Sequence, residues 1–251
     1  MSVNHTTTPL SEFLFIDKPI GPTSHDAVET IRSMLGGHRA GIKVGHAGTL
    51  DPLASGLLIL GLGAATKLLG RLVGLDKTYE VEITLGATST TDDAEGPIEP
   101  SAVILKPPIA EVEQVLRKFI GEQKQIPPAF SAKKQGGQRL YKIARRGGNV
   151  NIKPHYITIY KIKLSQYKYP KLRLIIHCSS GTYVRALARD IGQALGTGGY
   201  VSRLRRIAIG PFTVAEALPV SIDQDTLRAA LRNPDIILST TQEWIKKEAR
   251  S

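Results

Sequence analysis

The order of strand-type and helix-type patterns constrains the fold of this chain more than any other feature of its sequence. From Tyr79 to Leu85, apolar and polar residues alternate with the period of a half-buried strand. Apolar runs predict further strands at residues 13–16, 57–62, 156–164 and 172–178. Helical spacing predicts helices at residues 25–35, with Ser24 as the N-cap, and at 64–73, 109–120 and 182–195. Because strands and helices do not alternate regularly, the pattern favours an α+β fold.

Positive charge is concentrated in the second half of the chain. Lys and Arg number 33 against 22 Asp and Glu, a net charge of +11. The 67 residues from Gln123 to Arg189 contain 15 Lys/Arg and no acid, and seven of the eight tyrosines fall between Tyr141 and Tyr200. Basic residues interleaved with aromatics can neutralise phosphates and stack on bases. This segment, with Arg203, Arg205 and Arg206 continuing it, favours binding of a polyanion over the solvated basic face of an ordinary enzyme.

Within this segment, residues 125–151 carry two prolines, four glycines and six Lys/Arg, without a long periodic pattern. The composition predicts an extended loop, and loops of this length are usually functional. We expect it to close over RNA, with backbone contacts from Lys133, Lys134, Arg145 and Arg146.

Several reaction classes lose support because their motifs are missing. The six histidines never fall at metal-ligand spacing, and the only cysteine, Cys178, cannot form part of a Cys-rich metal site. There is no Walker motif or nucleophile elbow, and Gly61–Lys67 resembles a phosphate loop only superficially. The first ten residues do not resemble a secretory signal, and no apolar run approaches the roughly 18 residues of a membrane span. We therefore expect a cytoplasmic protein that uses no metal.

The most unusual stretch runs from Gly45 to Gly56, with the sequence GHAGTLDPLASG. It places one acid, Asp51, among glycines and small residues just before an apolar strand. Pro52 disfavours helix at Asp51, so this acid could project from a loop that rests on rigid structure. Taken alone, Asp51-Pro52 is better explained by ordinary turn chemistry.

This run resembles the catalytic loop of the bacterial tRNA pseudouridine-55 synthases, the TruB family. The likeness continues, in the family's order, at residues 18–24, 65–67, 77–79, 180–185 and 204–206. It implies a pseudouridine synthase catalytic domain at residues 10–212, with a mixed, largely antiparallel sheet flanked by helices and the basic loop near 125–151. Many relatives append an RNA-binding PUA domain. Because residues 213–251 are too few for that module, we expect them to form a short tail of one or two helices.

The resemblance implies that the chain isomerises uridine to pseudouridine at position 55, in the T-loop of tRNA. The target base would be flipped out, and Asp51 would form a covalent intermediate at C1′ or C6. Nothing is oxidised and no group is transferred, so no cofactor is expected. The implied partner is the T-arm stem-loop, and we expect a monomer without an obligate protein partner.

Two further catalytic roles follow from the resemblance. Arg185 would stabilise the ionised Asp51 carboxylate, since a nearby cation favours the charged form; the alternative is a phosphate contact. Tyr79 would place its ring against the target base with its hydroxyl near C5; the alternative is a core tyrosine.

The substrate-binding residues are also assigned by resemblance. His46 would stack in the space that the flipped base vacates, and Tyr183 and Leu204 would line the nucleotide pocket. Asp93 would be an acid near that pocket, or an ordinary turn residue. Lys18 and Lys67 would contact phosphates, or be plain surface lysines.

Two other functions remain open at this point. The same basic face could belong to a non-catalytic RNA-binding or tRNA-folding protein. Alternatively, the loop at Gly61 could serve an enzyme that binds a small phosphorylated molecule, although the acid-free segment argues against this second function.

Overall fold

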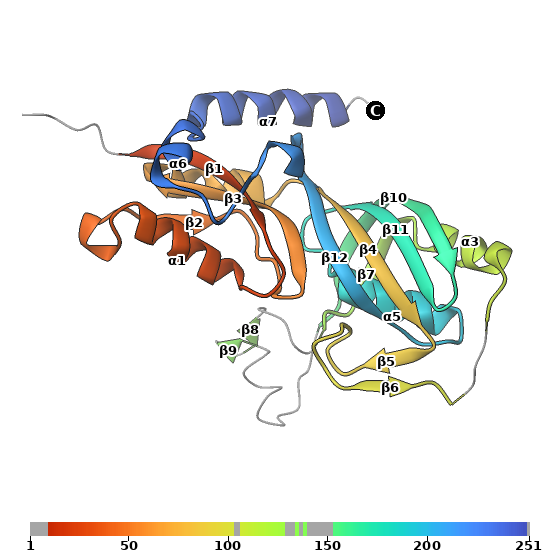
Figure 1. Ribbon diagram of the computed structural model, residues 1–251. Helices are drawn as coiled ribbons and strands as arrows, with labels where there is room; N and C mark the ends of the chain where they lie inside the picture. Colours follow the sequence, from red (N-terminus) through yellow and green to blue (C-terminus); the bar gives the residue numbers. More distant parts are fainter. Residues whose placement is uncertain (1–9, 103–105, 129–133, 136–137, 140–152, 250–251) are drawn as a thin grey trace, which may run out of the picture. The chain divides into compact units, whose positions relative to one another are not determined.

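The computed structural model describes residues 10–102, 106–128, 134–135, 138–139 and 153–249 (Figure 1). The chain forms two compact units. The first consists of Met1–Leu75 and Arg206–Ser251, and the second of Asp76–Arg205. Strand β12 (Gly199–Ile209) contributes residues to both.

The first unit contains a small mixed group of strands. β1 (Ser11–Lys18) and β3 (Ala54–Gly63) pair antiparallel along their length, and β2 (Val44–His46) pairs antiparallel with β3. The short β14 (Leu218–Pro219) runs parallel to β1. β13 (Phe212–Thr213) folds back on the end of β12.

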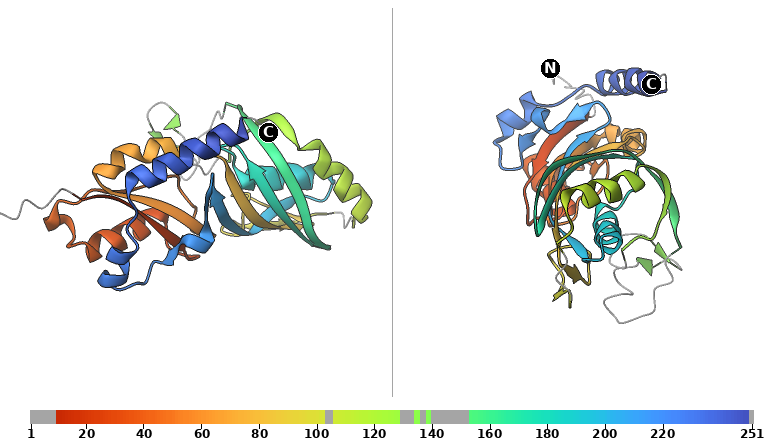
Figure 2. Two further views of the ribbon diagram at one scale, coloured as in Figure 1. Left: turned by 90° about the horizontal axis from the view of Figure 1, so that it is seen from above. Right: turned by 90° about the vertical axis from the view of Figure 1, so that its right-hand side faces the viewer.

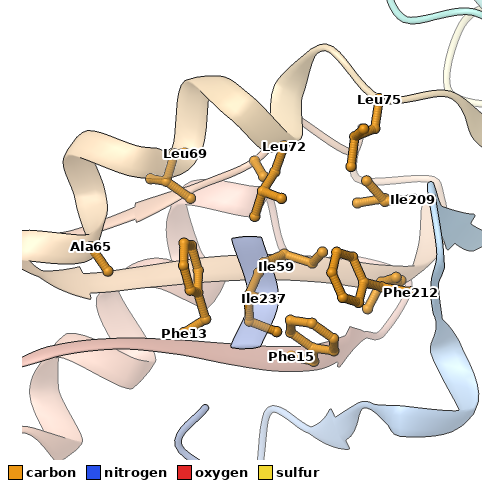
Figure 3. Packing of buried hydrophobic residues seen from close by; sticks show 12 residues of the cluster. Phe13, Phe15, Ile59, Ala65, Leu69, Leu72, Leu75, Ile209, Phe212 and Ile237 are labelled. Carbon is orange, nitrogen blue, oxygen red and sulfur yellow. The ribbon is translucent and has the colours of Figure 1, made fainter. Parts of the chain in front are cut away.

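Helices cover both faces of these strands, which explains why β1 is apolar at four successive positions. Phe13 and Phe15 face one cluster, with Ile237 of α7 (Pro234–Glu248) and residues of α2 (Leu69–Val73), as Figure 3 shows. Leu14 and Ile16 face the other, with residues of α1 (Ser24–Met34) and α6 (Gln224–Ala229). In Figures 1 and 2, α1 and α7 lie on opposite sides of the strands.

Two helical expectations fall in this unit. Residues 213–251, expected to form one or two helices, contain α6 and α7, which follow a 3₁₀ turn, η3 (Val214–Glu216). The helix expected at 64–73 begins as a 3₁₀ helix, η2 (Ala64–Leu68), and continues as α2. A further 3₁₀ turn, η1 (His38–Ala40), follows α1.

The N-cap prediction for α1 was wrong by one residue. Thr23, not Ser24, caps the helix: its side chain accepts from the Asp26 backbone N–H, and the Asp26 carboxylate accepts from the Thr23 N–H. This reciprocal pair satisfies two donors at the start of the helix. The hydroxyl of Ser24 is therefore available for a different task.

The second unit is built on four antiparallel strands, in the order β4 (Lys77–Leu85), β11 (Lys171–Cys178), β10 (His155–Lys168) and β7 (Gly121–Gln125). The alternation in β4 is confirmed, because Tyr79, Val81, Ile83 and Leu85 are all buried. Helices α3 (Ile109–Lys118) and α5 (Val184–Ala194) pack against strands of this unit (Figure 2). β5 (Ala87–Ser89) and β6 (Ile98–Pro100) form a separate hairpin. The predicted α+β fold with a mixed, largely antiparallel sheet and flanking helices is confirmed.

The basic loop expected at residues 125–151 lies mostly outside the described residues. Its described part contains a two-residue strand pair, β8 (Lys134–Gln135) and β9 (Gln138–Arg139). Lys133, Arg145 and Arg146 lie outside the described residues, and for Lys134 only the backbone is described. Their predicted contacts with RNA remain predictions.

Candidate active site

Asp51 lies in the loop that joins β2 to β3, in the first unit. Its own carbonyl accepts from the Ala54 N–H (3.0 Å), and the carbonyl of Pro52 accepts from the Gly21 N–H (2.9 Å). The side chain of Asp51 is partly exposed. Gly48 and Gly56 flank the acid with φ of +110° and +106°, a conformation that side-chain-bearing residues rarely adopt. The glycines therefore allow two sharp changes of chain direction around one carboxylate.

Two buried side chains, Ser24 and Arg206, hold the backbone of this loop through hydrogen bonds, and neither role is predictable from the sequence. The Ser24 hydroxyl accepts from the Leu50 N–H (2.7 Å) and donates to the Leu50 carbonyl (2.9 Å). The guanidinium of Arg206 donates to the carbonyls of Gly48 (3.0 Å) and Leu57 (2.8 Å). Arg206 was grouped with the phosphate-binding residues of the basic segment. That interpretation was wrong for this arginine, because it is only 1% exposed.

His46 ends β2, opposite Leu60 of β3. Burial lowers the pKa of its imidazole, and the nearby charges of Arg206 and His25 lower it further. Among the described residues, its Nδ1 has no hydrogen-bond partner. The ring is consequently neutral at pH 7, the form in which a histidine stacks on a base without a charge of its own.

Lys18 and Lys67 differ in their exposure to solvent. Lys18 is fully buried, and its ammonium donates to the carbonyls of Pro19 (2.8 Å) and Pro22 (2.7 Å). The alternative that Lys18 is a plain surface lysine was therefore wrong. Lys67, in η2, is exposed.

In the second unit, Arg185 and Asp93 form a buried ion pair. Nη1 of Arg185, in the first turn of α5, lies 3.0 Å from Oδ2 of Asp93, and the two side chains are 7% and 1% exposed. The same nitrogen donates to the carbonyl of Thr91 (3.0 Å). Asp93 also accepts from the Thr91 hydroxyl (2.5 Å) and from the Glu95 N–H (3.0 Å). These bonds fix the orientation of the guanidinium, which a flexible arginine would not keep unaided.

A second ion pair, between Arg189 and Asp92, involves the neighbouring acid. Arg189, one turn further along α5, binds Oδ2 of Asp92 (2.9 Å) and Oδ1 of Asp190 (2.9 Å). Burial raises the pKa of Asp92, although Arg189 and Arg185 oppose the rise. The resemblance points to Asp93 alone among these acids, and Asp92 and Asp190 become candidates only through their contacts with Arg189.

Tyr79, Leu204 and Tyr183 each have a defined place in this unit. Tyr79 is 9% exposed and lies in β4 opposite Ile176, and Leu204 is 7% exposed in β12. Tyr183 is the N-cap residue of α5. The Gln125 side chain grips its backbone at both ends, accepting from its N–H (2.9 Å) and donating to its carbonyl (3.1 Å). These two bonds fix the backbone from which the Tyr183 ring projects, and they are not predictable from the sequence because they join residues 58 positions apart.

Other reactive groups offer little in the described part of the chain. Burial raises the pKa of the Cys178 thiol to about 12, so it is not a thiolate at neutral pH. Among the described residues, no group of three or more His, Cys, Asp or Glu is arranged to hold a metal ion. No helix among them has the length and apolar character needed to cross a membrane.

Comparison with known proteins adds independent information. Residues 32–184 match the TruB family pseudouridylate synthase N-terminal domain, and residues 185–232 match the tRNA pseudouridylate synthase B C-terminal domain. A tRNA pseudouridine synthase B of Mycobacterium sp. (strain KMS) is 44% identical over 247 residues, covering 95% of this chain and 81% of the relative. The protein of the same name from Pseudomonas fluorescens (strain Pf0-1) is 44% identical over 213 residues, covering 83% of this chain and 67% of the relative.

Solved structures give the same result at greater distance. A Cbf5–Nop10–Gar1 complex contains a chain that matches with a TM-score of 0.67 and 28% identity, covering 88% of this chain and 59% of the solved one. An H/ACA RNP bound to a substrate RNA contains one that matches with a TM-score of 0.65 and 25% identity, covering 88% and 58%. This chain therefore spans less than two thirds of each solved chain. From the two domain matches and the close bacterial relatives, the chain belongs to the TruB family of pseudouridylate synthases, which are isomerases.

Proposed function

We propose that this enzyme converts uridine to pseudouridine at position 55, in the T-loop of tRNA. The proposal rests on the Gly45–Gly56 loop. This loop presents one partly exposed acid, Asp51, and its backbone is held by hydrogen bonds from Ser24 and Arg206. The bacterial relatives at 44% identity are named tRNA pseudouridine synthase B, which supports tRNA as the substrate.

The proposed reaction breaks the C1′–N1 bond, turns the base and joins C1′ to C5. The electron pair of the broken bond stays on N1, so N1 takes up one proton as C5 loses one. Atoms and electrons balance without an oxidant or a transferred group. The step needs one nucleophile that bonds to the nucleoside at C1′ or C6 and is later released. We assign this role to Asp51.

Arg185 and Tyr79 are assigned the other two catalytic roles. A cation near a desolvated carboxylate keeps it ionised. The ion pair with Asp93 supports this role for Arg185, because it holds the guanidinium in one orientation. Tyr79 would present its hydroxyl near C5. Its small exposed fraction suits contact with a base better than contact with solvent.

A base in a folded loop must leave its stack before it can react. We propose that the neutral ring of His46 fills the vacated space and that Tyr183 and Leu204 line the nucleotide pocket. Asp93 acts there through Arg185. Lys67 is free of burial and suits a phosphate contact, whereas Lys18 would serve the substrate only through the backbone that it binds.

RNA binding beyond the reacting nucleotide is assigned to the acid-free segment. We propose backbone contacts from Lys133, Lys134, Arg145 and Arg146, within a catalytic domain of residues 10–212 that is followed by the helical tail. We further propose that the enzyme acts as a cytoplasmic monomer. Sedimentation at micromolar concentration would test the oligomeric state.

The proposed function is tested with a tRNA transcript and a matched transcript that carries cytidine at position 55. Pseudouridine is mapped by chemical modification and primer extension. We expect conversion at position 55 of the first transcript and none in the second. Conversion at another uridine would refute the proposed position. Tight binding without conversion at any uridine would instead favour a non-catalytic RNA-binding protein.

A further inference from the structure

The peptide that carries Asp51 is held on its N-terminal side by a buried hydroxyl. Ser24 is 1% exposed, and its Oγ bonds both the N–H and the carbonyl of Leu50, the residue directly before Asp51. A hydroxyl can donate and accept at once, so one small side chain fixes both polar groups of that residue. Because Thr23 caps α1, the position of Ser24 is set by the helix, and Leu50 is thereby tied to α1.

Arg206 donates to the backbone of two residues of the same loop and to the adjoining strand β3. Its Nη2 donates to Gly48 (3.0 Å), its Nη1 reaches Thr49 (3.5 Å), and its Nε donates to Leu57 (2.8 Å). The planar guanidinium presents its donors in a fixed, forked geometry, so it sets the distance between the Gly48 and Leu57 backbones as well as their positions. Leu57 belongs to β3, so the loop is tied to the central strand of this unit.

Gly56 allows this arrangement. A Cβ at Gly56 would lie 2.2 Å from the carbonyl oxygen of Arg206, a distance that no side chain tolerates. The backbone of Arg206 can therefore approach the loop closely, and its side chain lies against Gly48 and Leu57 rather than in solvent.

We propose that Ser24 and Arg206 are positioning residues that fix the aim of the Asp51 carboxylate. The inference rests on the proposed role of Asp51 as nucleophile. Both side chains bond backbone atoms of the loop or of β3, and each is 1% exposed, so neither is placed to touch RNA. Their loss should therefore slow the chemical step without weakening RNA binding.

The test measures the single-turnover rate of uridine conversion at saturating enzyme, together with the Kd for the same T-arm RNA. Ser24→Ala removes both bonds to Leu50. A displacement of about 1 Å at a reacting group can cost on the order of 10²-fold in rate. We expect a loss of that order with little change in Kd. Arg206→Lys keeps the charge but not the fork, and should act in the same direction.

The matched control is Ile237→Val, which removes one methyl group from the core of the same unit, in α7. This variant should have a lower Tm, but the loss of one methyl group breaks no hydrogen bond of the Asp51 loop. Its single-turnover rate should therefore equal that of wild type. Rates are compared well below the Tm of every variant.

Two results would overturn the inference. If Ser24→Ala and Arg206→Lys convert uridine as fast as Ile237→Val, the two side chains do not aim Asp51. If their Kd rises in proportion to the loss of rate, general disorder of the loop explains the effect instead. Asp51→Asn is run in parallel. Conversion by that variant would refute the nucleophile assignment itself, whereas an inactive Asp51→Asn beside a fully active Ser24→Ala would refute only the positioning role.

Discussion

Replacing Arg185 by Met tests how much the buried ion pair between Arg185 and Asp93 contributes to the free energy of unfolding. Met keeps an unbranched side chain of similar helix propensity, so the change removes charge and hydrogen bonds with little effect on the helix itself. Asp93 would then be left as a carboxylate that is 1% exposed and is still bonded to the Thr91 hydroxyl and the Glu95 N–H. Removing one member of a buried pair costs about 3–5 kcal/mol. We expect the free energy of unfolding to fall by that amount.

The same substitution at Arg117 is the matched control. Arg117 pairs with Glu113 one turn away in α3, at 3.8 Å, and the two side chains are 73% and 50% exposed. Exposed pairs of this spacing contribute only about 0.3–0.5 kcal/mol. Urea unfolding followed by circular dichroism measures both variants, with the m-values compared to check that unfolding remains cooperative. A loss at Arg185 that equals the loss at Arg117 would refute the reasoning.

Three further predictions concern the base contact, the basic loop and the pH dependence of stability. Tyr79→Phe keeps the ring but removes the hydroxyl, so the RNA Kd should persist while turnover falls sharply; wild-type turnover would exclude the hydroxyl from removal of the C5 proton. Replacing the four basic residues of the loop by Ala should weaken tRNA binding and flatten its salt dependence, and an unchanged slope would exclude the loop from the interface; the four are Lys133, Lys134, Arg145 and Arg146. Burial opposes ionisation of Glu82, but hydrogen bonds from Lys171, Ser202 and Arg173 outweigh it and lower its pKa to about 2. The stability that Glu82 contributes is thus present above pH 4.5, its ordinary pKa, and lost as pH falls toward 2, so the Tm difference between wild type and Glu82→Gln should shrink below pH 4.5.

Elements with a clear hydrophobic period were predictable from the sequence. The alternation in β4 and the stripe of α3 depend on local pattern, and both form within a few residues of the predicted bounds. Asp51 is identifiable from the sequence because the surrounding motif resembles one family.

The supporting contacts could not be predicted, because they join distant parts of the chain. Arg206 lies among basic residues in sequence and is separated from Gly48 by 158 positions. Its burial depends on the close approach of its backbone to Gly56, which is a feature of the folded chain and not of the local sequence. Serine commonly caps helices, so the sequence predicts Ser24 as the cap. In the structure Thr23 caps the helix, and Ser24 binds Leu50, 26 positions away. The pairing of Arg185 with Asp93 spans 92 positions for the same reason.

The central claim is that Asp51 is the nucleophile of a uridine isomerase. Asp51→Asn keeps the size of the side chain but removes its charge and nearly all its nucleophilicity. The direct test is a single-turnover assay of this variant with T-arm RNA, at enzyme excess, with the Kd measured on the same RNA. We predict binding at least as tight as that of wild type, because a negative charge is removed from a polyanion site, and no detectable pseudouridine. A general-base role would contribute only about 10²- to 10⁴-fold, so it would leave measurable conversion. Readily measured conversion by Asp51→Asn would contradict the claim.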